Sequence, residues 1–204
     1  MKRAFDLAIA IPALVLVSPV IGVAALAVKL DSRGSAFYRG ERIGLEGRPF
    51  RILKLRSMAP GADRVGPAVT IAGDPRITRV GRVLRRTRLD ELPQLWNVIR
   101  GDMSLVGPRP EHPDYVRLYT PEQRRVLTVR PGITSNTSLA FHDEERLLAK
   151  HGGESSYADA LLPQKLALDL EYVEDHSLGG DLQILGRTFV FALTRWFRRS
   201  SHQQ

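Results

Sequence analysis

LAIAIPALVLVSPVIGVAALAV, residues 7–28, decides where this chain folds, because none of its 22 residues carries a charge. A helix needs about 20 such residues to cross a bilayer. Three interpretations fit this segment: a membrane-spanning helix, a cleaved signal peptide with Lys2 and Arg3 as its basic start, and a re-entrant hairpin that enters one leaflet and returns. All three bring the segment to a membrane.

Two features favour the hairpin. Positive charge next to a membrane segment stays on the cytoplasmic side, so a spanning helix would have to export one of two basic groups. Ser18 and Pro19 lie mid-segment, where Pro19 cannot donate to the Val15 carbonyl and the Ser18 hydroxyl can occupy it. We therefore predict a helix-break-helix hairpin over residues 1–30, broken at Ser18 and Pro19. The flanking basic residues are Lys2, Arg3, Lys29, Arg33, Arg39 and Arg42.

The composition indicates an anionic partner. Thirty Lys and Arg against twenty-two Asp and Glu give a net charge of +8. Aromatic residues make up only 7% and no nucleic-acid module is recognisable, so we expect no nucleic-acid partner. The absence of cysteine excludes disulfides, thiolate metal sites and a cysteine nucleophile. The five histidines show no metal-ligand spacing.

Residues 31–204 are predicted to form one α/β domain, rich in helix, on the cytoplasmic face of the membrane. Leu92, Leu95, Trp96 and Ile99 follow helical spacing and predict an apolar helix face that ends at Gly101. Strands are predicted over 36–39 and 50–55, a loop over 59–75, and further helices over 79–88, 121–128, 161–175 and 182–199.

The last of these helices is amphipathic. Its apolar residues lie on one side and its arginines on the remaining surface, a pattern that suits a bilayer interface. The alternative is a helix that packs on the core and has a solvated basic end. Exposed apolar helices would also permit a homodimer. The residues concerned are Leu182, Leu185, Phe189, Leu193, Trp196 and Phe197, with Arg187, Arg195, Arg198 and Arg199.

The chemistry-bearing motif is the adjacent pair Asp90 and Glu91, in RRTRLDELPQLWNV (85–98). Pro93 is tolerated only in a first helical turn, so the pair lies where a helix begins, and a helix-capping role is the alternative to catalysis. The pair is surrounded in sequence by cations, which a carboxylate needs if it is to attack an anionic diphosphate. These cations are Lys54, Arg56, Arg85, Arg86, Arg88 and Arg109.

Four blocks of sequence carry a family resemblance. They are ERIGLEGRPFRILKLRSM (41–58), ITRVGRVLRRTRLDELPQLWNVIRGDMSLVGPRP (77–110), VRPGIT (129–134) and LDLEYVEDHSLGGDLQIL (168–185). Together with the apolar segment, they resemble the bacterial sugar transferase family, in the small single-domain form of monotopic phosphoglycosyl transferases. The resemblance spans essentially the whole chain.

The resemblance implies a function. The donor would be a UDP-sugar, the acceptor undecaprenyl phosphate, the cofactor Mg²⁺, and the location the cytoplasmic face of the bacterial inner membrane, in contact with lipid. Asp90 would attack the β-phosphate to form a covalent phosphosugar intermediate and release UMP. Glu91 would assist magnesium binding or proton handling, while Lys54, Arg85 and Arg109 match the family's phosphate-handling positions. The reaction would be the first membrane step of glycoconjugate assembly.

Residues 135–145 depart from the commonest family pattern. Many members have Gly-Trp-Ala-Gln after VRPGIT, whereas this chain reads SNTSLAFHDEE. We expect the segment to border the sugar; the alternative is that Asp143, Glu144 and Glu145 only supply favourable charge to the next helix. The sequence leaves two rival functions open: a basic nucleic-acid binder and a structural membrane adaptor.

Overall fold

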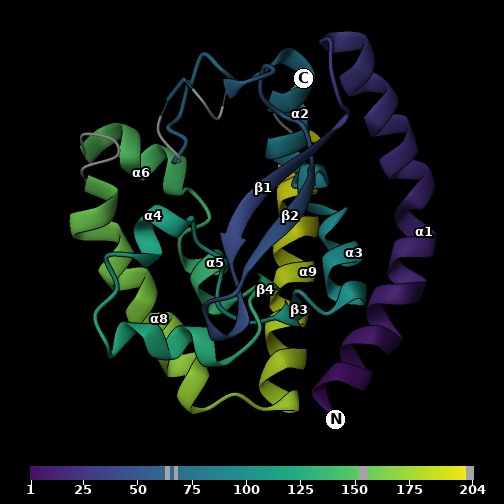
Figure 1. Ribbon diagram of the computed structural model, residues 1–204. Helices are drawn as coiled ribbons and strands as arrows, with labels where there is room; N and C mark the ends of the chain where they lie inside the picture. Colours follow the sequence, from purple (N-terminus) through teal and green to yellow (C-terminus); the bar gives the residue numbers. More distant parts are fainter. Residues whose placement is uncertain (63–64, 67–68, 152–155, 201–204) are drawn as a thin grey trace.

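The computed structural model describes residues 1–62, 65–66, 69–151 and 156–200, so the predicted 59–75 loop lies partly outside the described residues. The fold is α/β and rich in helix, as predicted (Figure 1). The elements in chain order are α1 (Lys2–Asp31), β1 (Phe37–Ile43), η1 (Leu45–Gly47), β2 (Pro49–Leu55), α2 (Arg79–Thr87), η3 (Leu89–Glu91), α3 (Gln94–Arg100), β3 (Ser104–Val106), α4 (Pro113–Val116), η4 (Gln123–Thr128), β4 (Gly132–Thr134), α5 (Asn136–Ala140), α6 (Glu144–His151), η5 (Tyr157–Leu161), α8 (Leu162–Glu174) and α9 (Leu178–Ser200).

The N-terminal helix corrects one prediction. α1 is a single α-helix that continues through Pro12 and Pro19, so the expected interruption at Ser18 and Pro19 is wrong. The reason is local: the Ser18 hydroxyl donates to the Val15 carbonyl at 2.8 Å and replaces the N–H that Pro19 lacks. α1 is long and apolar enough to cross a membrane and is the candidate membrane segment.

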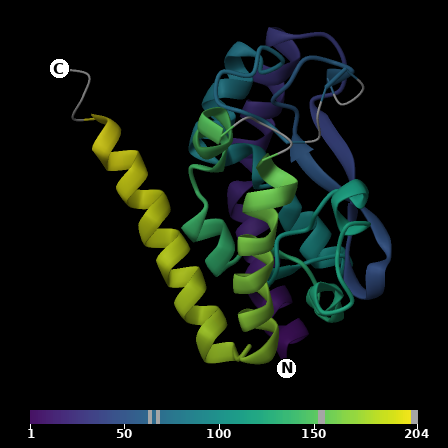
Figure 2. The same ribbon diagram turned by 90° about the vertical axis from the view of Figure 1, so that its left-hand side faces the viewer.

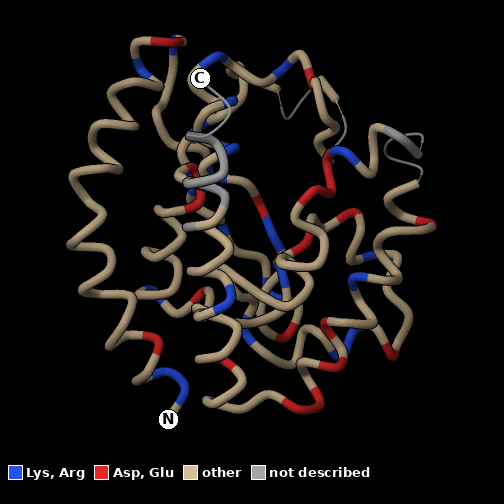
Figure 3. The backbone as a smooth tube through the Cα atoms, turned by 180° about the vertical axis from the view of Figure 1, so that it is seen from behind, with Lys and Arg blue, Asp and Glu red and all other residues tan. Residues whose placement is uncertain are grey.

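α1 has two different faces. Ala10, Ala24 and Val28 are buried against the rest of the fold, whereas Leu16 is 79% exposed and Leu30 80% exposed. Seen from behind, the backbone of α1 carries charged residues only at its two ends (Figure 3). One side of α1 is therefore an uninterrupted apolar surface about 20 residues long.

Both ends of α1 are held by the same domain. At the start, Lys2 forms an ion pair with Asp181 of α9, and Asp6 accepts hydrogen bonds from the Ser104 hydroxyl at 3.1 Å and the Leu105 N–H at 3.2 Å. At the far end, Asp31 accepts from the Val80 N–H at 3.1 Å. These contacts fix α1 lengthwise along the domain (Figure 1).

Two small sheets support the rest. β1 and β2 form the predicted antiparallel hairpin, with Phe37 opposite Leu55 and Ile43 opposite Pro49. β3 and β4 pair in parallel, with Ser104 opposite Gly132. The free edge of β2 is bonded to α3 by Asn97, whose side chain accepts from the Leu53 N–H at 2.9 Å and donates to the Arg51 carbonyl at 2.8 Å.

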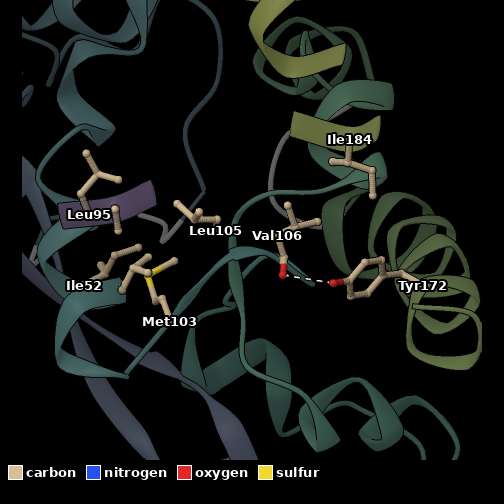
Figure 4. Close-up of a cluster of buried hydrophobic side chains, with 9 residues drawn as sticks. Ile52, Leu95, Met103, Leu105, Val106, Tyr172 and Ile184 are labelled. Carbon is tan, nitrogen blue, oxygen red and sulfur yellow. Dashed lines mark hydrogen bonds between the residues drawn. The ribbon is translucent and has the colours of Figure 1, made fainter. Parts of the chain in front are cut away.

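The main core lies where six elements meet (Figure 4). Ile52 of β2, Leu95 of α3 and Val106 of β3 are buried there, and the Tyr172 hydroxyl of α8 donates to the Val106 carbonyl at 3.1 Å. The predicted apolar face of α3 is only partly correct. Trp96 is 48% exposed, because the helix turns Asn97 and Val98 inward instead. Gly101, with φ of 94°, ends α3 as predicted.

The C-terminal helix α9 lies beside α8 at one end and diverges from it along its length (Figure 2). Ile184 is buried in the main core, whereas Leu182, Phe189 and Val190 are exposed. This half-packed apolar pattern fits both predicted interpretations, since part of the helix joins the core and part is open to an interface. The helix backbone continues to Ser200, but the remaining predicted side chains are not among those that the structure describes: Leu193, Arg195, Trp196, Phe197, Arg198 and Arg199.

Candidate active site

The Asp90–Glu91 pair lies in a tight connection between two helices. α2 ends at Thr87, Arg88 adopts the left-handed conformation with φ of 59°, and the 3₁₀ turn η3 follows. A non-glycine residue there costs about 1 kcal/mol or more, so the strained turn is held by its surroundings. α2 packs directly on the chain after β2, because a Cβ on Gly81 would lie 1.9 Å from the Ser57 carbonyl oxygen.

Neither acid caps a helix. The N-cap residue of α3 is Pro93, and no hydrogen bond joins the Asp90 side chain to any described residue. The capping interpretation of Asp90 therefore fails. The side chain is buried, with only 6% of the residue exposed, and its Oδ1 atom has no hydrogen-bond partner. A native fold leaves few such atoms, and they are common where a ligand is to be bound.

Glu91 gathers the cations. The Lys54 Nζ lies 2.9 Å from Glu91 Oε1, an Arg109 Nη atom lies 3.2 Å from it, and an Arg88 Nη atom lies 3.7 Å from it. All three contacts end on the same carboxylate oxygen. Three elements thus converge on one side chain: β2, the connection before η3, and the turn that follows β3.

The pKa values of the two acids are shifted in opposite directions. Burial raises the pKa of Asp90, the charge of Glu91 raises it further, and the Lys54, Arg85 and Arg88 charges only partly offset this. Burial also opposes ionisation of Glu91, yet Lys54, Arg109 and Arg88 together hold the pKa of Glu91 well below its ordinary value. Glu91 is therefore a fixed anion, and Asp90 is an unpaired carboxyl group beside it.

Comparisons with known proteins identify the family of this chain. The model of the family described as bacterial sugar transferase matches residues 1–195. This chain belongs to the bacterial sugar transferase family. It is 43% identical over 196 residues to the UDP-glucose:undecaprenyl-phosphate glucose-1-phosphate transferase of Caulobacter vibrioides, covering 95% of this chain and 70% of the relative.

Two further relatives show the range of the match. The exopolysaccharide production protein ExoY of Sinorhizobium fredii is 39% identical, covering 92% of this chain and 83% of the relative. The UDP-glucose:undecaprenyl-phosphate glucose-1-phosphate transferase of Escherichia coli K12 is 39% identical, covering 91% of this chain but 38% of the relative. The chain is a sugar transferase of the phosphoglycosyl transferase class, as the resemblance implied.

The candidate site brings together four of the five residues that the sequence predicted for catalysis and phosphate binding. Asp90, Glu91, Lys54 and Arg109 lie in one cluster. Arg85 is close enough for its charge to lower the Asp90 pKa, but it pairs with Glu145 of α6: its Nε atom lies 3.1 Å from Glu145 Oε1. In the described structure Arg85 is therefore shared between the site and α6.

Residues 135–145 border this cluster. The His142 carbonyl accepts from an Arg88 Nη atom at 3.5 Å, and Glu145 pairs with Arg85. Glu144 and Glu145 also lie in the first turn of α6, as the alternative interpretation expects. Both predicted roles are thus compatible with the structure, since Glu145, a first-turn acid of α6, pairs with Arg85.

The residues present fit a magnesium ion. Asp90 Oδ1 is an unpartnered carboxylate oxygen, and the ion pairs of Glu91 with Lys54 and Arg109 both end on its Oε1 atom. No group of three or more acidic or histidine side chains able to hold a metal is found among the described residues. Asp90 and Glu91 are two adjacent carboxylates, and Mg²⁺ is usually held by one or two carboxylates and completed by water and substrate phosphate.

Proposed function

We propose that this sugar transferase moves a sugar phosphate from a UDP-sugar to undecaprenyl phosphate, as the first membrane step of glycoconjugate assembly. The names of the Caulobacter and Escherichia relatives support the donor and acceptor classes. The observation that carries the mechanism is the buried Asp90 Oδ1 atom, which has no hydrogen-bond partner and lies among the charges of Lys54, Arg85 and Arg88.

In the first half-reaction, an Asp90 carboxylate oxygen attacks the β-phosphorus of the UDP-sugar. The bond from that phosphorus to the bridging oxygen breaks, and UMP leaves with the electron pair. Lys54, Arg88 and Arg109 would neutralise the charge that develops on the phosphate oxygens. Arginine suits this task because its planar fork binds two phosphate oxygens at once.

In the second half-reaction, a phosphate oxygen of undecaprenyl phosphate attacks the phosphorus held by Asp90. The bond between phosphorus and the Asp90 oxygen breaks and restores the free carboxylate. The product carries the sugar through a diphosphate. Among the described residues, Asp90 Oδ1 has no hydrogen-bond partner, so no hydrogen bond to this atom is broken when it is esterified or re-formed when it is freed. This suits a group that is esterified in every catalytic cycle.

Glu91 has a supporting role in this scheme. Its depressed pKa keeps it anionic, so it holds Lys54 and Arg109 beside Asp90 before substrate arrives. Asp90 and Glu91 would also hold Mg²⁺, which when bound supplies charge neutralisation for the diphosphate.

We also propose that α1 and the exposed side of α9 rest in the cytoplasmic leaflet of the inner membrane, in contact with lipid. The apolar face of α1 and the basic residues at both of its ends support this arrangement. It would place the acceptor phosphate at the level of the lipid headgroups, within reach of the domain.

The test is intact-mass analysis of the purified protein after incubation with UDP-sugars and Mg²⁺ in the absence of acceptor. We expect a phosphosugar adduct on the wild type and none on Asp90→Asn. Asp114→Asn, which changes an exposed acid paired with Arg117, is the matched control and should retain the adduct. Transfer to undecaprenyl phosphate by Asp90→Asn, or by a wild type that never forms an adduct, would refute the covalent mechanism.

A further inference from the structure

A second charged cluster lies near Arg109. We call the Asp90–Glu91 pair the dyad, and this second cluster is distinct from it. We call the second cluster the Lys165 cluster; it comprises Glu111, Glu144, Tyr157 and Lys165. The Lys165 side chain is 4% exposed, and its Nζ lies 3.2 Å from Glu111 Oε1 and 3.2 Å from Glu144 Oε2. It also donates to the Tyr157 hydroxyl at 2.8 Å. One buried ammonium group thus forms ion pairs with two carboxylates.

The carboxylates of the Lys165 cluster interact electrostatically with the Arg109 guanidinium. The pKa of Arg109 is raised by Glu91 first, against its burial, and then by Glu144 and Glu111. The Arg109 guanidinium contacts Glu91 at 3.2 Å, and Glu111 follows Arg109 by two residues in the chain. Charges in such a poorly solvated region interact over several ångströms.

We propose that Lys165 is a positioning residue for Arg109. By neutralising Glu111 and Glu144, Lys165 leaves the Arg109 guanidinium directed at the dyad, where the donor diphosphate would bind. Without Lys165, two unneutralised carboxylates would draw Arg109 away from Glu91. This inference rests on the proposed function, because it assigns Arg109 to the donor phosphates.

The test compares three variants by steady-state kinetics at varied UDP-sugar: Lys165→Met, Lys165→Met with Glu144→Gln, and Glu144→Gln alone. Lys165→Met should raise the KM for the donor by about tenfold or more, the size expected when one buried charge partner is lost. Adding Glu144→Gln removes one competing carboxylate and should recover much of that loss. Glu144→Gln alone should change KM by less than about twofold.

A purely structural role for Lys165 predicts a different pattern. If Lys165→Met has the wild-type KM, or if the double variant is as impaired as Lys165→Met, the proposal is wrong. If Lys165→Met does not fold, the double variant is compared with Glu144→Gln instead. In the double variant Glu111 keeps its charge without the ammonium partner, so the KM of the double variant should be several-fold higher than that of Glu144→Gln, and equal values would overturn the proposal. Failure of the wild type to transfer sugar phosphate at all would instead refute the proposed function.

Discussion

At the scale of single residues, the two adjacent acids have opposite effects on stability. Glu91 has a lowered pKa, so its ionised form stabilises the fold at pH values above its ordinary pKa of 4.5, and this contribution is lost as the pH falls through the folded value. Asp90 has a raised pKa, so its ionised form opposes folding, and that cost disappears as the pH falls below 3.8. The site thus pairs a stabilising anion with a costly one.

This contrast predicts opposite shifts in thermal unfolding of the detergent-solubilised protein. Glu91→Gln should destabilise the fold at pH 7 by about 2 kcal/mol, because Lys54 loses its buried partner. Asp90→Asn should raise the melting temperature at pH 7 while abolishing transfer. Both differences from wild type should shrink below about pH 4. A lower melting temperature for Asp90→Asn at pH 7 would contradict the assignment of Asp90 as an unpaired buried carboxyl group.

The sequence could predict the Asp90–Glu91 pair and the nearest cations, but not the ion pairs that connect them to α6 and α8. Asp90, Glu91, Lys54 and Arg109 were predicted because their motif and the nearby cations stand out in the sequence. Lys165 and its pairing with Glu144 were missed because the two residues are 21 positions apart and meet only through the packing of α8 against α6. A buried lysine carries no local pattern that distinguishes it from a solvated one. The pairing of Arg85 with Glu145, 60 residues away, was equally invisible.

At the scale of elements, local chemistry predicted turns and ends better than faces. The β1–β2 hairpin and the end of α3 at Gly101 follow from residues that act within a few positions. The exposure of Trp96 does not, because which side of α3 faces inward depends on Asn97 bonding to β2. A buried polar side chain overrode the hydrophobic pattern here, since it satisfies two backbone groups of an edge strand.

The continuity of α1 yields a prediction of its own. Ser18→Ala removes the hydroxyl that replaces the missing N–H of Pro19 and should destabilise the protein by about 1 kcal/mol. Pro19→Ala restores the N–H, so Ser18→Ala should cost little in that background. Thermal unfolding of the two single variants and the double variant measures this coupling. Additive effects would show that the Ser18 hydroxyl does not sustain the helix at Pro19.

At the scale of the whole molecule, the anchored ends of α1 predict its sidedness. The chain has no cysteine, so single cysteines can be introduced for labelling. Ala4→Cys and Ser35→Cys place a thiol at each end of α1, both at exposed positions. A membrane-impermeant reagent should label both in inside-out vesicles and neither in right-side-out vesicles. Labelling of the two ends from opposite sides would show that α1 spans the membrane.

The core contacts of α1 have a consequence for how this protein can exist at all. Ala10 is 0% exposed and Val28 is 1% exposed, so part of α1 belongs to the hydrophobic core of the domain. Removing α1 would open the core and take away the ion pair of Asp181 with Lys2 and the hydrogen bond from the Ser104 hydroxyl to Asp6. Removal of α1 is therefore expected to unfold this enzyme. A water-soluble form would require its exposed helix surface to be redesigned, because deletion would destroy the fold.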